Sequence, residues 1–460
     1  MLRAVSTLVC FLGAAQDPAP PVPESPPHIL LLVADDLGWN GVGYHGGPVP
    51  TPHIDSLAQS GARLEHFYAQ ALCSPSRAAL LTGRYPIRYG LQTGVLRPWA
   101  ELGLDLDERL LPEALQELGY ETSIAGKWHL GHYTKDHLPM QRGFEHQYGC
   151  FTGSIEPMQH TRMGTLDWAR NQKPLRERGY VTERIADEVV RRIEERDPER
   201  SLFLYVPFTA PHTPHFVPPK ERARFRHLEP KSLRQYAGVV GCLDDAIGRI
   251  LAALDEQGLR DETLILFLSD NGAEIDGGDR ERNAPLRDGK GELYEGGVRV
   301  PAVVSWPGRI EPGRVVDTPL HLVDLFPTLV GLAGGDVSEA GALDGIDAWP
   351  VLRGDDTVPR TLLLNVNGRT GAVRRGRWKL LRTKDGPTQR LELYDVVEDP
   401  GETRDLAKEQ PDRVQELSAA LQAFEAESVP AIFGKDEKPS GFQPPSFWGR
   451  MFARGEASRD

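Results

Sequence analysis

The sequence predicts an α/β fold in which a large, mostly parallel sheet is flanked by helices and followed by a smaller domain. Four apolar runs of strand length each end in polar residues, and segments with helical periodicity lie between them. Continuous apolar runs are typical of strands that are buried on both faces of a parallel sheet. The alternation of such strands with helices indicates a layered α/β architecture.

The four apolar runs share one arrangement, in which chargeable side chains follow the strand. The runs are 28–34, 120–125, 202–208 and 263–268, and the residues that follow them include Asp35, Asp36, Lys127, His129, His212, Asp270 and Asn271. In open α/β sheets, ligands bind beyond the carboxyl ends of the strands. The sequence therefore predicts an active site at this edge of the sheet.

Helical periodicity, and a change in the sequence pattern after residue 355, predict the rest of the fold. Apolar residues recur with helical spacing at 110–118, 181–196 and 232–258. After residue 355 the chain changes to short strand-like pieces at 362–366, 371–373, 378–382 and 390–394, followed by a helical segment at 404–426. We expect this part to form an α+β domain with a small antiparallel sheet and one helix.

The chain divides into five predicted regions. These are a signal peptide at 1–15, a flexible leader at 16–26, a large domain that carries the strand-end residues at 27–355, a C-terminal subdomain at 356–428 and an extended tail at 429–460. The N-terminal apolar run of about ten residues is too short to span a bilayer and precedes small residues. It predicts an exported protein, periplasmic or extracellular, without a membrane span.

Composition and charge argue against nucleic acid as a partner. The chain has 460 residues, of which 40% are hydrophobic and 26% charged, and its formal net charge is −13. Binding to phosphate backbones requires a basic face, although a local cluster of cations could still hold an anionic substrate. Beyond the signal peptide only Cys73, Cys150 and Cys242 remain, so the chain is not a disulfide scaffold. Whether Cys150 and Cys242 form a disulfide is left open.

Two strand ends supply oxygen ligands for a cation. Asp35 and Asp36 follow the first apolar run, whereas Asp270 and Asn271 follow the fourth. Taken separately, either pair could form a simple turn, and Asp270-Asn271-Gly272 could be a type I′ turn. Together, three carboxylates and a carboxamide select a hard cation such as Ca²⁺ or Mg²⁺ rather than zinc.

The segment 71–84 is predicted to begin a helix. Ser74 suits the N-cap and Pro75 the first helical position, which places Cys73 just before the helix. The helix dipole there favours an anionic sulfur or oxygen, and Arg77 adds a positive charge one turn later. For a lone cysteine, a buried structural role is the simpler interpretation.

Further candidate residues have basic side chains, although each of them could also be an ordinary residue of a surface loop. Lys127 and His129 are two residues apart, so in an extended segment their side chains point the same way. His212 lies in a loop bounded by prolines, and Lys290 lies between glycines. Each could be an ordinary surface residue.

The motifs, taken in order, resemble the type I sulfatases of the alkaline phosphatase superfamily, which depend on formylglycine and include the arylsulfatases. They are Asp35-Asp36, the C-x-P-x-R pentapeptide Cys73–Arg77, Gly126–His129, Ser269–Gly272, residues 291–301, and Glu392–Asp395 with Asp399–Thr403. The resemblance covers residues 28–408. It implies an alkaline phosphatase-like fold and the hydrolysis of sulfate esters to an alcohol and inorganic sulfate.

The resemblance also implies a nucleophile and a metal ion. Cys73 would be converted to formylglycine by a formylglycine-generating enzyme and would act as the nucleophile. One calcium ion would be bound by Asp35, Asp36, Asp270 and Asn271, together with residue 73.

The resemblance further implies roles for the basic side chains. Arg77 and Lys127 would stabilise the formylglycine diol and the sulfate oxygens, His129 would be the base that releases sulfate, and His212 and Lys290 would bind sulfate and protonate the leaving oxygen. The local match leaves open whether Ser154 or Thr152 also contacts the diol.

Two other functions stay open at the level of the sequence. A phosphodiesterase or phosphonate monoester hydrolase would share the scaffold, the metal and the nucleophile. A non-catalytic protein that binds sulfated glycans would need no nucleophile, and the complete set of lysine, histidine and metal ligands argues against it. The expected substrate is a sulfated carbohydrate, with chain ends or oligosaccharides favoured because an acidic surface repels long polyanions. The identity of the sugar and the oligomeric state are not predicted.

Overall fold

The computed structural model describes residues 26–275, 280–355, 359–432 and 437–449. The predicted signal peptide and nearly all of the predicted leader lie outside these residues. Within the described ranges, no helix has the length and apolar character needed to cross a membrane. Cys73, Cys150 and Cys242 are free and buried, so the structure contains no Cys150–Cys242 disulfide.

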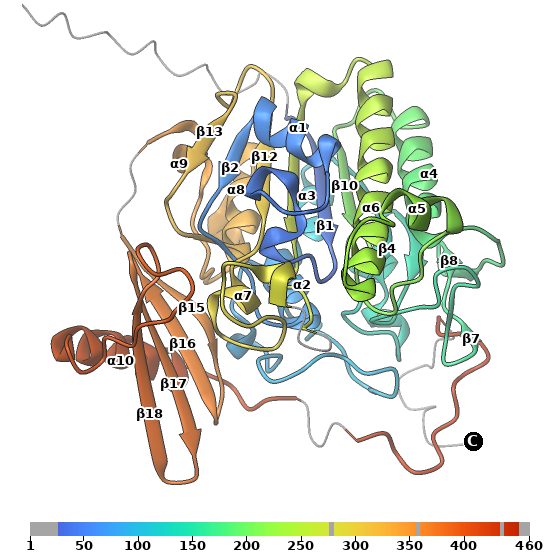
Figure 1. The fold of residues 1–460 in the computed structure, drawn as a ribbon. Coiled ribbons are helices and arrows are strands. Elements are labelled where there is room, and N and C mark those ends of the chain that lie inside the picture. The colour runs from blue at the N-terminus through green and yellow to red at the C-terminus, as the bar shows by residue number, and fades with distance from the viewer. Residues whose placement is uncertain (1–25, 276–279, 356–358, 433–436, 450–460) are drawn as a thin grey trace, which may run out of the picture.

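A mixed sheet of ten strands forms the centre of the large domain (Figure 1). Its order is β13 (Arg314–Val316), β2 (Ala62–Leu64), β12 (Ala302–Ser305), β11 (Thr263–Ser269), β1 (His28–Ala34), β10 (Leu202–Pro207), β4 (Glu121–Lys127), β5 (His146–Cys150), β8 (Ala169–Arg170) and β9 (Lys173–Pro174). The five strands from β11 to β5 run parallel, and antiparallel strands flank them. The predicted mostly parallel sheet is confirmed.

Helices cover both faces of this sheet, as the apolar runs require. Alternate residues of β1 point into two separate cores: Leu30 and Leu32 into one, and Ile29 and Leu31 into the other. The first core contains side chains of α1 (Pro52–Ser60), α4 (Val181–Glu194) and α6 (Lys231–Glu256), and the short α5 (Pro219–Arg224) packs on α6. The second contains side chains of α2 (Cys73–Thr82), α3 (Leu111–Glu117), α8 (Leu325–Leu332) and α9 (Trp349–Arg353).

The smaller C-terminal part contains an antiparallel sheet and one helix, as predicted. Its strands, in order, are β15 (Thr361–Val366), β16 (Thr370–Arg375), β17 (Trp378–Asp385) and β18 (Thr388–Asp395), and α10 (Pro411–Ala426) packs on one face (Figure 1). The other face contacts the large domain near α7 (Glu295–Val298). Two-stranded pairs β3 (Phe67–Tyr68) with β14 (Leu320–His321), and β6 (Thr161–Arg162) with β7 (Thr165–Leu166), complete the fold.

The predicted start of the last helix was wrong. We expected it near residue 404, but α10 begins at Pro411. The backbone N–H of Leu406 donates to the carbonyl of Leu393, and the N–H of Arg404 donates to the Asp399 carboxylate. These bonds hold the segment as a turn against β18, and Pro411 then supplies a favourable first helical position.

The described parts of the predicted extended tail are residues 429–432 and 437–449, and residues 433–436 and 450–460 lie outside the described residues. Neither described part has a helix or strand, and residues 437–449 pack on the large domain. Figure 1 shows this C-terminal segment passing beside β7 and β8. Trp448 is only 2% exposed, and its indole N–H donates to the carbonyl of Arg162 at 2.9 Å. The Phe447 ring contacts the Phe151 ring. The segment is therefore part of the folded large domain rather than a free extension.

A buried ion cluster joins the small sheet to the large domain. Lys379 of β17 places its ammonium 3.0 Å from Glu295 of α7 and 2.9 Å from Glu402. The Tyr68 hydroxyl donates to Glu295 at 2.7 Å. Burial alone would raise the pKa of Glu295, but Lys379 and neighbouring arginines outweigh it and lower this pKa to about 2.

We predict that Lys379→Met destabilises the protein strongly, because it leaves two buried carboxylates without their cation. Breaking such a pair costs about 3–5 kcal/mol, so thermal unfolding should begin at a clearly lower temperature. The matched control is Lys384→Met, which removes a half-exposed ion pair with Glu425 and should cost about 1 kcal/mol or less. Equal unfolding temperatures for the two variants would contradict the prediction.

Candidate active site

The carboxyl ends of four neighbouring strands bring the predicted site residues together. Strands β11, β1, β10 and β4 are adjacent and parallel, so their ends meet at one edge of the sheet. That edge carries Asp35 and Asp36 after β1, Asp270 and Asn271 after β11, Lys127 at the end of β4, and His212 after β10. The structure thus brings these predicted residues together at one edge of the sheet.

The turns after β1 and β11 are bonded directly to each other. Asp36 has a φ of 67°, a left-handed conformation that aspartate tolerates better than most residues. Its N–H donates to Asp270 Oδ1 at 3.2 Å, and the N–H of Leu37 donates to Ser269 Oγ at 2.9 Å. A type I′ turn needs positive φ at its two central residues, and neither Asp270 nor Asn271 has one. The type I′ interpretation of this motif is therefore wrong.

Helix α2 begins at Cys73 itself, with Leu72 as the N-cap residue. Ser74, the predicted N-cap residue, makes long-range hydrogen bonds instead of capping the helix. Its hydroxyl donates to the carbonyl of His129 at 3.0 Å and accepts from the N–H of Leu96 at 3.1 Å. Ser74 therefore ties α2 to two loops of the site. These partners are distant in sequence, so local capping preference gave the wrong assignment.

The Cys73 thiol lies among carboxylates. Cys73 is 1% exposed, and its Sγ is 3.4 Å from Asp35 Oδ1 and 3.8 Å from Asp36 Oδ1. Burial first, and then the charge of Asp270, raise the pKa of the thiol well above its usual value. Reactive cysteines instead have a lowered pKa that yields a thiolate. An unmodified Cys73 is thus poorly suited to act as a thiolate nucleophile.

Two lysines face the two aspartates that follow β1. The ammonium of Lys127 lies 2.7 and 3.0 Å from the two carboxylate oxygens of Asp35, and that of Lys290 lies 2.7 Å from Asp36 Oδ2. His212 Nε2 is 3.7 Å from the same Asp36 oxygen. Burial favours a higher pKa for Asp36, but Lys290, His212 and Lys127 outweigh it and hold this pKa well below its usual value.

Arg77 lies behind the third carboxylate. Its Nε and Nη2 donate to Asp270 Oδ2 at 3.0 and 2.8 Å, and its Nη1 donates to the carbonyl of Lys127 at 3.0 Å. Burial and the charge of Asp35 raise the pKa of Asp270 to about 6, while Arg77 opposes them. The guanidinium is fully buried and engaged by protein groups, an arrangement that favours a positioning role.

The strand-end residues fit a hard cation. Ligand atoms of Asp35, Asp36, Cys73 and His212 all lie within 4.8 Å of one another. Asn271 Oδ1 is a buried carbonyl oxygen without a hydrogen-bond partner, and buried acceptors in proteins normally have one. The predominance of carboxylate and carboxamide oxygens matches the ligand preference of Ca²⁺ and Mg²⁺.

His129 presents an unpaired ring nitrogen. Its Nε2 is 3.0 Å from the carbonyl of Leu96, which can only accept, so Nε2 carries the hydrogen and Nδ1 has the lone pair. Nδ1 is buried and has no partner. Burial, with Lys127 and Arg77, lowers the pKa of His129 well below its usual value. The expected extended geometry was wrong here, because His129 has a φ of 62°.

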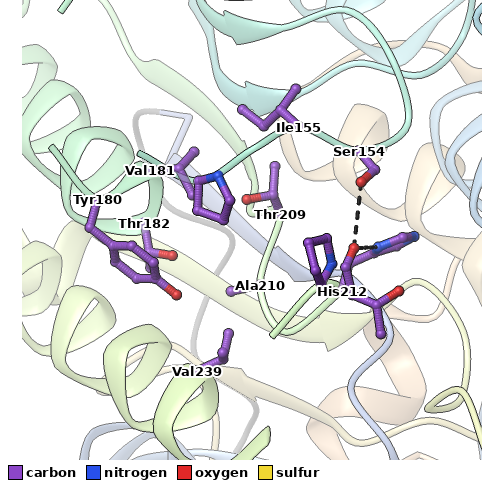
Figure 2. A pocket seen from close by; sticks show the side chains of 12 residues that line it. Ser154, Ile155, Tyr180, Val181, Thr182, Thr209, Ala210, His212 and Val239 are labelled. Atoms are coloured by element: carbon purple, nitrogen blue, oxygen red, sulfur yellow. Dashed lines mark hydrogen bonds between the residues drawn. The ribbon is translucent and has the colours of Figure 1, made fainter. Parts of the chain in front are cut away.

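His212 has the opposite hydrogen arrangement. The Thr213 carbonyl accepts from His212 Nδ1 at 2.6 Å and from the Ser154 hydroxyl at 3.4 Å. Dashed lines in Figure 2 mark these bonds of His212 and Ser154. Nδ1 therefore carries the hydrogen, and Nε2 is the nitrogen near Asp36. Burial lowers the pKa of His212 to about 4, against the opposing charge of Asp36.

The site opens into a cavity of ≈ 680 Å³. Cys73, His129, His212 and Lys290 line it, and so do Thr93–Pro98, Ser154, Arg162 and Glu274. A much smaller cavity of ≈ 20 Å³ shares Ser154 and His212 with it, and Figure 2 shows that apolar side chains such as Ile155 and Val239 line that second space. Of the two residues left open as a further contact, only Ser154 reaches the large cavity. The hydroxyl of Thr152 is bonded to Asp167.

Several functional positions were missed by reasoning from the sequence. Arg97, Arg162 and Glu274 line the cavity from loops and short hairpins that have no recognisable motif. Gly153 lies against the His129 ring, because a Cβ on it would meet Cε1 at 2.5 Å. Ser74 differs from these residues because a sequence motif contains it. Its place inside the C-x-P-x-R pentapeptide could have indicated a role in the site.

Comparison with known proteins matches both parts of the chain. A sequence model of the sulfatase family matches residues 27–335, and one described as N-sulphoglucosamine sulphohydrolase, C-terminal, matches residues 289–427. Arylsulfatase A of Bos taurus is 35% identical and aligns with 96% of this chain and 95% of its own length. Arylsulfatase J of Mus musculus is 32% identical, with 93% and 81% covered.

A solved structure is also similar to this chain over most of its length. The protein Ps i-CgsB, in complex with k-i-k-neocarrahexaose, superposes with a TM-score of 0.82 at 31% sequence identity. The match covers 89% of this chain and 95% of that one. The large domain and the small C-terminal sheet thus recur together in a related protein.

We predict that His129 and His212 are neutral at pH 7.5 and hold opposite tautomers, Nε2–H for His129 and Nδ1–H for His212. In each ring one nitrogen lies against a backbone carbonyl, which can only accept, so that nitrogen must carry the hydrogen. Nitrogen-15 NMR of histidine-labelled protein distinguishes the two tautomers, and His129→Gln and His212→Gln variants assign the signals. The same tautomer in both rings would contradict the prediction.

Proposed function

The chain belongs to the sulfatase family and hydrolyses sulfuric esters, and from this premise we propose that it does so through a formylglycine at residue 73 and one calcium ion. The observation that carries the proposal is the position of Cys73. It begins a buried helix, lies within 4 Å of two carboxylates, and faces the large cavity.

A formylglycine resolves the difficulty that the thiol presents. Burial and nearby carboxylates keep the unmodified sulfur protonated, so a thiolate mechanism has no support from the environment of Cys73. When formed, the hydrated aldehyde at residue 73 would supply two hydroxyls, one to displace the alcohol from sulfur and one whose deprotonation expels sulfate. The C-x-P-x-R pentapeptide supports its conversion by a formylglycine-generating enzyme.

The calcium ion would be held by Asp35, Asp36, Asp270 and Asn271, together with residue 73. The unpartnered Asn271 Oδ1 and the converging ligand atoms of Asp35, Asp36 and Cys73 support this set, and Asp270 is included because of the sequence motif it shares with Asn271. When bound, the ion would supply a Lewis acid close to the sulfate oxygens. Arg77 and Lys127 keep Asp270 and Asp35 in place and balance their charge.

His129 is proposed as the base for sulfate release. Its Nδ1 is buried, unpaired and lone-pair bearing, so it can take the proton from a hydroxyl at residue 73. The Leu96 carbonyl fixes this tautomer, and Ser74 anchors the backbone of His129 to the helix that carries Cys73.

Lys290 and His212 are proposed to bind the sulfate group, and Lys290 to supply the proton that the leaving oxygen takes. For His212 to share the second role, as also expected from the resemblance, its Nε2 would first have to gain a proton. Both line the cavity beside Cys73. Lys290 also lies 2.7 Å from Asp36, which holds its ammonium at the edge of the ligand cluster. Lys127 has the matching position on the other side, against Asp35. Arg77 and Lys127 were also expected to stabilise the diol and the sulfate oxygens, and this stays a prediction.

A sulfated carbohydrate is the proposed substrate. The cavity is large enough for more than a sulfate group and is lined by hydroxyl, amide-backbone and charged groups that suit a saccharide. The related Ps i-CgsB, which was crystallised with a hexaose, supports this class. The net charge of −13 favours oligosaccharides or chain ends over long polyanions.

Export is also proposed, on the sequence pattern of residues 1–15. That region lies outside the described residues, so its support is the short apolar run followed by small residues. Export would place the enzyme in the periplasm or outside the cell, where sulfated polysaccharides are accessible.

The decisive test is co-expression with a formylglycine-generating enzyme, followed by mass spectrometry of the peptide that contains residue 73. We expect an aldehyde in place of the thiol, together with turnover of 4-nitrophenyl sulfate. Cys73→Ala should lower this turnover by at least about a thousandfold, because the nucleophile is lost.

Two outcomes would contradict the proposal. An intact thiol in an active preparation would exclude formylglycine as the nucleophile. A higher kcat/KM for bis(4-nitrophenyl) phosphate than for 4-nitrophenyl sulfate would instead support the phosphodiesterase alternative.

The metal proposal predicts calcium binding that depends on Asn271. Titration calorimetry of the full chain should show one calcium ion, and Asn271→Ala should weaken binding by about tenfold or more because a ligand is removed. The control is Asn367→Ala, which removes a carboxamide from a turn of the small sheet. Tighter binding of Mg²⁺ than Ca²⁺, or equal affinities for the two variants, would contradict the assignment.

A further inference from the structure

We infer, on the basis of the proposed function, that the substrate carries a second anionic group beside the scissile sulfate, and that Arg162 binds this group next to Arg97. Both arginines line the same cavity as Cys73, His129 and Lys290. None of the motifs that identified the site includes either arginine.

Arg162 is a half-buried cation without a partner among the described residues. No carboxylate forms an ion pair with its guanidinium, no side-chain hydrogen bond from it is present there, and its Nε is buried without an acceptor. Proteins pair buried charges because an uncompensated one loses hydration and gains nothing. A cation left in this state on a cavity wall is suited to an anionic ligand.

Asp167, the carboxylate whose charge acts most strongly on Arg162, is already engaged by other groups. Asp167 accepts from the backbone N–H groups of Phe151 and Thr152, at 2.9 and 3.0 Å, and from the Thr152 hydroxyl. It therefore has little capacity left for Arg162. Burial lowers the pKa of Arg162, the charge of Asp167 opposes this shift, and Arg97 adds to it, so the guanidinium lies in a desolvated environment beside a second cation.

The structure holds Arg162 in place from outside the cavity. The Trp448 indole donates to the Arg162 carbonyl at 2.9 Å, and Trp448 packs in turn on His132 and Phe442. Arg162 also ends strand β6, which pairs with β7. Because the backbone of Arg162 is fixed by these contacts, less conformational entropy is lost when an anion binds.

The other charged groups of the cavity leave this position available for an anion. Among the described lining residues, Glu274 is the one carboxylate, and it accepts from the Thr213 hydroxyl at 3.1 Å. Lys290 and His212 lie beside Asp36, where the scissile sulfate is expected. An anion on a neighbouring part of the substrate would therefore meet Arg162 and Arg97.

Two chemical sources fit a guanidinium equally well. A carboxylate of a uronic acid and a second sulfate ester both present two oxygens that the planar fork of arginine can bind. We therefore assign the substrate class as sulfated oligosaccharides with an additional charge on the sulfated sugar or its neighbour.

The test measures binding, so it does not depend on turnover. The full chain with Cys73→Ser is titrated by calorimetry with three sulfated disaccharides, which have a neutral, a carboxylated or a second sulfated sugar beside the sulfated unit. We expect at least one of the two charged ligands to bind about tenfold or more tightly than the neutral one. Arg162→Gln should remove most of this preference. Arg178→Gln, an equal charge change at an exposed residue outside the cavity lining, should retain it.

A second measurement covers the case in which none of these sugars fits. Crystals of the same protein soaked in selenate should show an anion at Arg162 by anomalous scattering, and Arg162→Gln should lose it. Equal affinity for all three disaccharides, a preference that survives Arg162→Gln, or selenate confined to the Lys290 side would overturn the inference. Absence of sulfatase turnover in the matured wild type would count against the proposed function only, since this test is made on unmatured protein.

Discussion

The concentration of three buried carboxylates at the ends of β1 and β11 is the constraint on which the rest of the site depends. Parallel pairing of the two strands places Asp270 beside Asp36, and neither charge can reach bulk water. Each carboxylate must therefore be balanced by a cation from elsewhere in the chain, and Lys127, Lys290 and Arg77 supply one each. The positions of β4, α2 and the loop at Lys290 follow from this need.

The small C-terminal sheet supports the same site from a distance. Glu295, which is buried against Lys379, is followed in α7 by Gly296, and a Cβ on Gly272 would lie 1.7 Å from the Gly296 carbonyl. Gly272 in turn follows the metal-ligand candidate Asn271. A continuous series of close contacts thus runs from β17 to the ligand cluster, so the two parts of the chain position one site together.

The framework of the site was predictable, but the contacts that fix its geometry were not. Apolar runs and strand-end residues located Asp35, Lys127 and Asp270 correctly, because parallel topology leaves little freedom in where strand ends lie. Ser74 was mistaken for an N-cap, since its partners His129 and Leu96 are distant in sequence. Arg162 was missed because a half-buried arginine in a short hairpin has no periodic signal. Long-range tertiary contacts outweighed local preference in both cases.

The part of the cavity wall that contains Arg162 can form only late during synthesis of the chain. The Arg162 carbonyl is held by Trp448, 286 residues further along the chain, so a ribosome must add nearly the whole sequence before this wall can close. Cys73, by contrast, emerges early and afterwards lies in a helix whose every residue is buried, at the inner end of the cavity. The segment around Cys73 is therefore accessible as an unfolded chain long before the cavity wall at Arg162 is completed by docking of the C-terminal segment.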